Sequence, residues 1–190
     1  MNEPINNKQN NERVWYAIQT LHCKEERLGQ YLATKGLNYF IPMQYVEQIT
    51  LDGKRHRVLT PAIHNLLFVE KTFDEKEIRS IVTDSPVPLI LVRHRDTKKY
   101  YEIPDREMLE FRAICDPNYT GTLYVEAAVA EARPGSRVRV IHGAFKGLEG
   151  KLTRYKNRYY VVITVASIGV MIHIPKWYCM KLEETNHPFL

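Results

Sequence analysis

The sequence predicts an α+β domain over residues 12–118, followed by a small all-β barrel over residues 134–183. In the first part, β-branched and aromatic runs alternate with segments whose apolar residues recur at helical spacing, which favours a sheet with packed helices. In the second part, short alternating runs follow one another with turns between them, which is typical of a small barrel. The excess of basic over acidic residues is also confined to the second part, which indicates two regions with different roles.

Length and composition set the limits of this interpretation. The chain has 190 residues, of which 44% are hydrophobic, and no apolar run approaches the roughly 20 residues that cross a bilayer. We therefore expect a cytoplasmic protein with no membrane contact, and polar tails at 1–11 and 184–190. The three cysteines, Cys23, Cys115 and Cys179, lack zinc-ligand spacing, so we expect free, mostly buried thiols and neither a metal nor another cofactor.

The first half of the α+β domain shows strand, helix and hairpin signals in that order. Residues 14–20 form a β-branched and aromatic run, and 23–35 carry a helical apolar face that ends at Gly36, a typical C-terminal cap. A second strand region covers 39–49. The Asp52-Gly53 pair then predicts a hairpin turn.

The second half of this domain repeats the alternation. Residues 65–70 are strongly apolar and predict a buried strand, and the capping-box spacing of 72–75 predicts a helix over 73–82. A strand at 88–92 and a helix opened by Pro104 over 104–115 complete the domain. We expect one antiparallel sheet with its helices on one face.

Residues 119–133 contain Gly121 and a low-complexity stretch, which predicts a linker. Beyond it, five short strands fit an SH3-like barrel. Residues 159–165 favour a strand so strongly that we expect no helical form of this segment. The expected strands are 137–141, 151–155, 158–165, 169–174 and 178–182.

A glycine-rich turn follows the first barrel strand. Its residues are Gly143, Phe145, Gly147 and Gly150, and the glycines recur at fixed offsets between two alternating runs. Such spacing predicts backbone angles that side chains forbid, so these residues shape the turn.

The charge distribution points to a polyanionic partner. Residues 134–183 carry nine Lys and Arg against two Glu, a net charge of +7, whereas residues 12–118 carry 16 of each sign. A concentrated basic field favours nucleic acid or an acidic protein surface. The basic residues of the expected barrel face are Arg137, Arg139, Lys146, Lys151, Arg154, Lys156 and Arg158.

The glycine spacing resembles the KOW motif, and the preceding domain resembles the NGN domain of NusG-family transcription factors. Trp15-Tyr16 matches the start of the family's first strand, and 63–70 stands where the family has Phe-Pro-Gly/Asn-Tyr-Leu-Phe-Val. Residues 78–81 match its Val-Arg-Ser-Val. The resemblance covers residues 13–183 in order.

Two departures from the family pattern point to a specialised member. The family's Phe-Pro pair is Ile63-His64 here, and its Tyr is Leu66. The chain is most similar to the UpxY-type antiterminators of bacterial capsular polysaccharide operons and, more distantly, to RfaH. The resemblance implies a monomeric adaptor that binds elongating RNA polymerase and raises its processivity.

The resemblance also implies partners for particular residues. An apolar depression would bind the clamp helices of the largest polymerase subunit through Tyr16, Ile18, Leu66, Phe68 and Ile81. The gate loop of the second-largest subunit would contact Lys76, Glu77, Arg79 and Ser80. Non-template or upstream DNA would contact His22, Lys24, Arg27, Tyr31, Lys54, Arg55 and Arg57. The barrel would bind a ribosomal protein, a termination factor or RNA.

Three other interpretations remain at this point. A general NusG-type factor would couple polymerase to the ribosome or to a termination factor, and the altered residues 63–66 argue against it. A simple RNA-binding KOW protein would leave 15–79 unexplained. An enzyme is disfavoured because the sequence contains no nucleophile elbow, P-loop or zinc-protease motif.

Overall fold

The computed structural model describes residues 13–72, 74–94, 97–119, 121–165 and 168–182. The expected tails therefore lie outside the described residues. The N-terminal sheet is antiparallel and has the order β2-β5-β1-β6, with β7 also paired to β1. Its strands are β1 (Val14–Thr20), β2 (Tyr39–Phe40), β5 (Leu66–Glu70), β6 (Leu89–Leu91) and β7 (Glu102–Pro104). The predicted strands at 14–20, 65–70 and 88–92 are confirmed within two residues.

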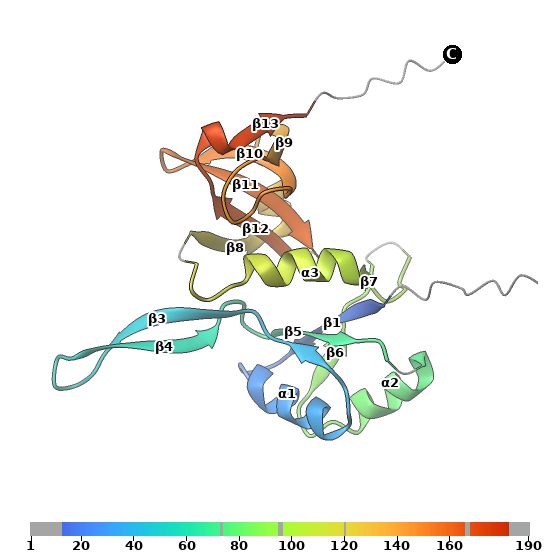
Figure 1. Ribbon diagram of the computed structural model, residues 1–190. Helices are drawn as coiled ribbons and strands as arrows, with labels where there is room; N and C mark the ends of the chain where they lie inside the picture. Colours follow the sequence, from blue (N-terminus) through green and yellow to red (C-terminus); the bar gives the residue numbers. More distant parts are fainter. Residues whose placement is uncertain (1–12, 73, 95–96, 120, 166–167, 183–190) are drawn as a thin grey trace, which may run out of the picture.

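Helices cover both faces of this sheet, so the prediction of helices on one face was wrong. Helices α1 (Glu25–Thr34) and α2 (Glu75–Thr83) pack on one face, and α3 (Asp105–Ile114) packs on the other (Figure 1). Strand β1 is buried on both faces because Tyr16 and Ile18 pack with the first two helices, while Trp15 and Ala17 pack with the third. Strands buried on both sides carry continuous apolar runs, and such runs do not reveal which layer covers which face.

Helix α1 ends at the predicted glycine cap, and α2 begins with a capping box. Gly36 follows α1 with φ 74°, as expected for a glycine cap. The capping box of α2 is formed by Asp74 and Glu77, two residues later than predicted from 72–75. The Asp74 side chain accepts the Glu77 N–H at 2.7 Å, and the Glu77 carboxylate accepts the Asp74 N–H at 3.1 Å.

The predicted hairpin is present, and it forms a separate two-stranded sheet. Strands β3 (Met43–Ile49) and β4 (Arg55–Pro61) pair with each other and project from the domain (Figure 1). Gly53, with φ 77°, lies in the connecting turn. Ile49 and Leu51 near the tip are exposed large apolar side chains.

The C-terminal domain is an SH3-like barrel to which the expected linker adds a strand and a helix. The sheet order is β13-β9-β10-β11-β12-β8. Its elements are β8 (Thr122–Glu126), α4 (Ala127–Glu131), β9 (Ser136–Val140), β10 (Glu149–Tyr155), β11 (Arg158–Val165), β12 (Ile168–His173), η1 (Lys176–Tyr178) and β13 (Cys179–Lys181). The five predicted barrel strands are present. Most of the segment 119–133 is regular structure, because β8 pairs with β12 from Thr122 to Glu126.

The barrel lies against α3 (Figure 1), and one apolar cluster runs through both domains. The connection between them is held at Tyr119, whose ring packs edge-on against Phe145 at a centroid distance of 4.8 Å. The Tyr119 hydroxyl donates to the His173 carbonyl at 2.6 Å. The Thr122 hydroxyl donates to the carbonyl of Ile114, the last residue of α3, at 3.4 Å. The two domains are therefore docked.

Candidate functional site

An apolar groove opens where β1 ends, β5 begins and β6 runs past them. It has a volume of about 670 Å³, and its apolar lining includes Leu21, Ile63, Leu66 and Ile90. Leu66 is buried, whereas Leu21 and Ile90 are 50% and 64% exposed. Ile168 from strand β12 of the barrel lines the same groove. Exposed apolar side chains that converge on a concavity are typical of a surface that binds an apolar partner.

The five residues predicted to bind the clamp helices do not form one surface. Tyr16, Ile18 and Ile81 lie on the face covered by α1 and α2, whereas Leu66 and Phe68 lie on the opposite face. Strand register explains this separation, since Tyr16 pairs with Val69 while Ala17 pairs with Phe68. Because successive side chains on a strand point to opposite faces, residues 16 and 68 cannot share one.

Burial removes most of these five residues from contact with a partner. Tyr16, Ile18 and Phe68 are at most 1% exposed, so they form the core of the domain. Ile81 is half-buried and packs against the same helices. Leu66 lines the groove, and the sequence analysis missed its neighbours Leu21 and Ile90. Leu21 directly follows β1 and Ile90 lies within β6, and in both places an apolar residue resembles an ordinary core position.

The predicted gate-loop residues share one exposed helix, α2. Lys76, Glu77, Arg79 and Ser80 are all exposed. Glu77 completes the capping box, and the Ser80 hydroxyl lies 3.5 Å from the Asp84 carboxylate. Of these side chains, Lys76 makes no hydrogen bond or ion pair with the other described residues, so it is the most available to a partner.

The first group of DNA-contact candidates lies at α1. His22 and Arg27 are exposed and Lys24 is half-buried. Tyr31 has a packing role, because its hydroxyl donates to the Ile81 carbonyl at 2.9 Å and its ring lies in the α1–α2 core. Tyr31 is therefore less available to DNA than the other predicted residues of this group.

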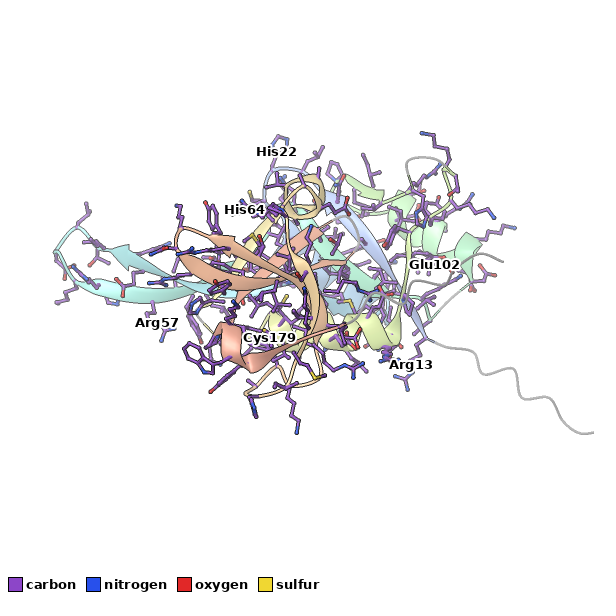
Figure 2. All side chains as sticks on the ribbon, turned by 90° about the horizontal axis from the view of Figure 1, so that it is seen from above. Arg13, His22, Arg57, His64, Glu102 and Cys179 are labelled. Carbon is purple, nitrogen blue, oxygen red and sulfur yellow. The ribbon has the colours of Figure 1, made fainter. Side chains whose placement is uncertain are left out.

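The second group lies on the hairpin, where each basic side chain has an acidic or aromatic neighbour. Lys54 lies 3.1 Å from the Asp52 carboxylate, and Arg55 lies 3.7 Å from that of Glu47. The Arg57 guanidinium lies 4.5 Å from the centre of the Tyr45 ring, and Arg57 is far from His22 and His64 (Figure 2). All of these pairs are exposed, so they cost little to separate when a phosphate approaches.

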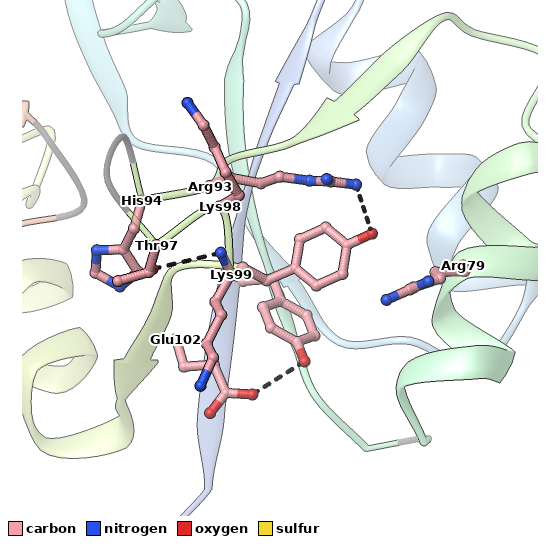
Figure 3. A pocket seen from close by; sticks show the side chains of 9 residues that line it. Arg79, Arg93, His94, Thr97, Lys98, Lys99 and Glu102 are labelled. Carbon is pink, nitrogen blue, oxygen red and sulfur yellow. Dashed lines mark hydrogen bonds between the residues drawn. The ribbon is translucent and has the colours of Figure 1, made fainter.

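A basic pocket that the sequence analysis missed surrounds Tyr100. It has a volume of about 820 Å³, and Arg79 from α2 and Arg93 from the segment after β6 extend toward it (Figure 3). Their guanidinium carbons lie 5.1 and 4.8 Å from the centre of the Tyr100 ring, and Arg93 also donates to the Tyr100 hydroxyl at 3.1 Å. Lys98 and Lys99 line the same pocket. Such an arrangement can receive an anionic group.

Glu102, the one acidic residue among the described residues that line this pocket, is held by a lysine and a tyrosine. The Lys71 ammonium donates to it at 2.6 Å and the Tyr16 hydroxyl at 3.1 Å. The hydrogen bond from Lys71 is the largest cause of the lowered pKa of Glu102, and the same bond raises the pKa of Lys71. Burial raises the pKa of Tyr16, so its hydroxyl remains a proton donor at neutral pH.

The predicted basic face of the barrel is partly neutralised. Arg137 and Arg139 both lie within salt-bridge distance of Glu149. Lys151 donates to the Glu131 carbonyl at 2.6 Å, and Arg154 donates to the Asn157 side chain. The remaining predicted members, Lys146, Lys156 and Arg158, are exposed. Trp177, which the sequence analysis did not single out, is 76% exposed on the same barrel.

The glycine-rich turn has the shaping role that its spacing predicted. Gly143 and Gly147 have φ values of 81° and 97°, which side chains rarely adopt. Gly150 is required for a different reason, since an added Cβ would lie 2.6 Å from both the Val161 side chain and the Val162 carbonyl. Phe145 packs on Tyr119, so the turn also positions the connection between the domains.

The cysteines are free, as predicted, but they differ in burial. Cys115 is buried, and burial raises the pKa of its thiol to about 12, which makes it unreactive. Cys179 is half-buried. Cys23 is exposed, contrary to the expectation of a buried thiol.

An NGN-type sheet domain with an apolar groove, followed by a KOW barrel, defines a two-domain transcription factor. The family model described as transcription termination factor NusG matches residues 13–112, which is more than half of the chain. The chain therefore belongs to the NusG family. Members of this family generally bind RNA polymerase and are not enzymes.

Solved structures and curated proteins were also compared with this chain. The solved structure "Domain interaction in Thermotoga maritima NusG" is similar over 90% of this chain and 98% of its own, with a TM-score of 0.47 and 17% sequence identity. No curated protein matches the chain. Within the described residues, every helix is too short or too polar to cross a membrane.

Proposed function

We propose that this chain is a specialised NusG-type factor that binds elongating RNA polymerase and raises its processivity. The groove carries the proposal, because Leu21 and Ile90 expose apolar surface beside the buried Leu66 within one concavity. Other exposed apolar side chains of the domain, such as Leu51 and Leu109, do not line it. A groove of this kind fits the apolar face of a helix. The resemblance of the sequence to NusG-type factors assigns that helix to the clamp of the largest polymerase subunit.

The residues that depart from the family pattern support the specialised role. Ile63, His64 and Leu66 all line the groove, so the chain differs from a general factor at the surface proposed to contact polymerase. The finer proposal is antitermination at polysaccharide-type operons, as in the UpxY-type factors that the sequence resembles. A general NusG-type role and a simple RNA-binding role are the alternatives.

The other contacts extend this proposal. Exposed residues of α2, Lys76 above all, would meet the gate loop of the second-largest subunit. His22, Lys24 and Arg27 at α1 and the basic hairpin would contact DNA through its phosphates. Lys146, Lys156, Arg158 and Trp177 would let the barrel bind a ribosomal protein, a termination factor or RNA.

The test is capture of bacterial core RNA polymerase by the full chain and by the double variant Leu21→Asp, Ile90→Asp. Both side chains are at least half exposed, so the variant keeps its fold, whereas carboxylates in an apolar interface should weaken capture by at least about 10-fold. Leu51→Asp on the hairpin is the matched control and should capture polymerase normally. Equal capture by the groove variant and the unmodified chain overturns the proposed site.

Polymerase capture alone does not show antitermination. Transcription in vitro across an intrinsic terminator should yield more read-through with the full chain, and the groove variant should lose this gain. If the chain captures polymerase but increases termination, the general or termination-coupled role is correct. If only RNA binds, and binds through the barrel, the RNA-binding alternative is correct.

A further inference from the structure

Three potential metal ligands meet at the edge of the N-terminal domain beside the groove. Cys23 and Glu25 come from the turn and first residue that lead into α1, and His64 comes from the turn before β5. Their ligand atoms all lie within 4.8 Å of one another. His64 lies at the same edge of the molecule as His22 and far from Glu102 (Figure 2).

The separation of the sulfur and nitrogen atoms fits a shared ion. The Cys23 Sγ lies 3.7 Å from the His64 Nδ1. Zinc bonds of about 2.3 Å to sulfur and about 2.05 Å to nitrogen, at a tetrahedral angle, place the two ligand atoms about 3.6 Å apart. The distance between these two atoms therefore matches the one that a shared ion requires.

Glu25 supplies a buried carboxyl group at this place. It is only 1% exposed, and within the described residues it has no salt bridge to a lysine or arginine. One carboxylate oxygen accepts the Asn65 backbone N–H, which fixes the orientation of the group. A buried carboxylate without a cation is costly, so a bound cation would stabilise it.

The backbone around these ligands is fixed in an unusual conformation. His22, Cys23 and Asn65 have φ values of 61°, 52° and 62°, although none of them is glycine. The Cys23 N–H donates to the Asn65 side-chain oxygen at 2.8 Å, and the Thr20 N–H donates to the Asn65 carbonyl at 3.0 Å. These bonds hold the two turns together without any ion, so the ligands are arranged in advance.

We propose that Cys23, Glu25 and His64 bind one Zn²⁺ ion, with the fourth coordination position open to solvent. One thiolate, one imidazole and one carboxylate match the donor preferences of Zn²⁺ and not those of Mg²⁺ or Ca²⁺. Binding replaces the Cys23 thiol proton, which is released to solvent. Cys23 and His64 are exposed, so the ion can reach the site directly.

The experiment titrates the reduced full chain with Co²⁺, whose bonds to thiolate give a charge-transfer band in the near ultraviolet, and then displaces it with Zn²⁺. We expect one Co²⁺ per chain. Cys23→Ser should abolish the band. His64→Ala removes a direct ligand, so it should weaken Co²⁺ binding by more than about 10- to 100-fold, which is the cost of losing a residue that only supports a ligand. Cys179→Ser and His142→Ala change residues outside the cluster, so they should leave both the charge-transfer band and the Co²⁺ affinity unchanged.

Glu25 needs a separate variant because it also accepts a backbone hydrogen bond. Glu25→Gln retains an acceptor for the Asn65 N–H, so the fold should persist while Zn²⁺ binds more weakly. Zn²⁺ should also raise the melting temperature of the unmodified chain and not that of Cys23→Ser.

Several results overturn the proposal. These are the absence of a thiolate band, a band that survives in Cys23→Ser, a band lost only in Cys179→Ser, and unchanged Zn²⁺ affinity in Glu25→Gln. Polymerase is absent from every measurement, so the outcome is independent of the proposed function.

Discussion

Replacing Phe68 with Ala should destabilise the N-terminal domain. Phe68 is 0% exposed, and its ring centre lies 6.3 Å from that of Phe40 and 5.2 Å from that of Phe111. Truncating a buried Phe to Ala costs about 3–5 kcal/mol, because the lost burial and the remaining cavity add together. The two aromatic neighbours place the expected loss in the upper part of that range.

Urea unfolding followed by the fluorescence of Trp15 measures this loss. Trp15 is 3% exposed within the same core, and a Trp177→Phe background removes the signal of the exposed barrel tryptophan. Phe68→Leu is the matched control, because it retains most of the apolar volume and should lose much less stability. A loss below about 1 kcal/mol in Phe68→Ala would show that the ring is not the core residue described here.

Because Phe68 lies in the core, loss of polymerase binding in Phe68→Ala does not identify a contact residue. A Phe68→Ala chain that fails to capture polymerase reports unfolding of the sheet. The variants Leu21→Asp and Ile90→Asp change exposed side chains, so their effects report the groove itself.

Three further predictions concern a cap, a turn and a charge. Asp74→Ala should cost about 0.5–2 kcal/mol and Thr72→Ala almost nothing in urea unfolding, because Asp74 is the N-cap of α2; equal losses would contradict this assignment. Gly150→Ala should lower the melting temperature more than Gly53→Ala. The Cβ added at Gly150 would lie 2.6 Å from backbone and side-chain atoms, whereas the Cβ added at Gly53 has open space and only an unfavourable φ. The reverse order of melting temperatures would refute the steric argument. The lowered pKa of Glu102 means that its carboxylate stabilises the fold above its unfolded-state pKa of about 4.3, and that this contribution is lost as pH falls through the lower folded value. In Glu102→Gln, the free energy of unfolding should therefore change slightly less with pH in that acidic range than it does in the unmodified chain. Parallel curves for the variant and the unmodified chain would count against this prediction.

The sequence predicted the elements of this fold well because their local signals agree with their environment. Strand β5 is apolar throughout and buried throughout, and Gly36 and Gly53 adopt the positive φ values that their positions require. The linker prediction failed because an Ala- and Glu-rich composition outweighed the strand-forming residues of Thr122–Glu126. Pairing with β12 decides the conformation of that segment, and composition does not encode this pairing.

The candidate site was less predictable because it depends on which layer covers each face of the sheet. The family resemblance placed Tyr16 and Phe68 together, but alternation along paired strands sends them to opposite faces. The pocket at Tyr100 gathers Arg79 from α2 and Arg93 from the segment after β6. The ligand cluster joins Cys23 and His64, which are 41 residues apart and therefore have no zinc-like spacing in the sequence.

Asn65 links the groove to the ligand cluster. It lines the groove, accepts hydrogen bonds from the Thr20 and Cys23 backbones, and donates its own N–H to Glu25. Asn tolerates the left-handed backbone that this position requires better than most residues. A single residue therefore fixes both the turn that presents Ile63 and His64 to the groove and the turn that presents Cys23. Because Asn65 joins these turns, the segment 63–66 contributes residues both to the proposed polymerase surface and to the proposed zinc site. Of the residues that depart from the family pattern, Ile63, His64 and Leu66 all line the groove, and His64 is also one of the three proposed zinc ligands.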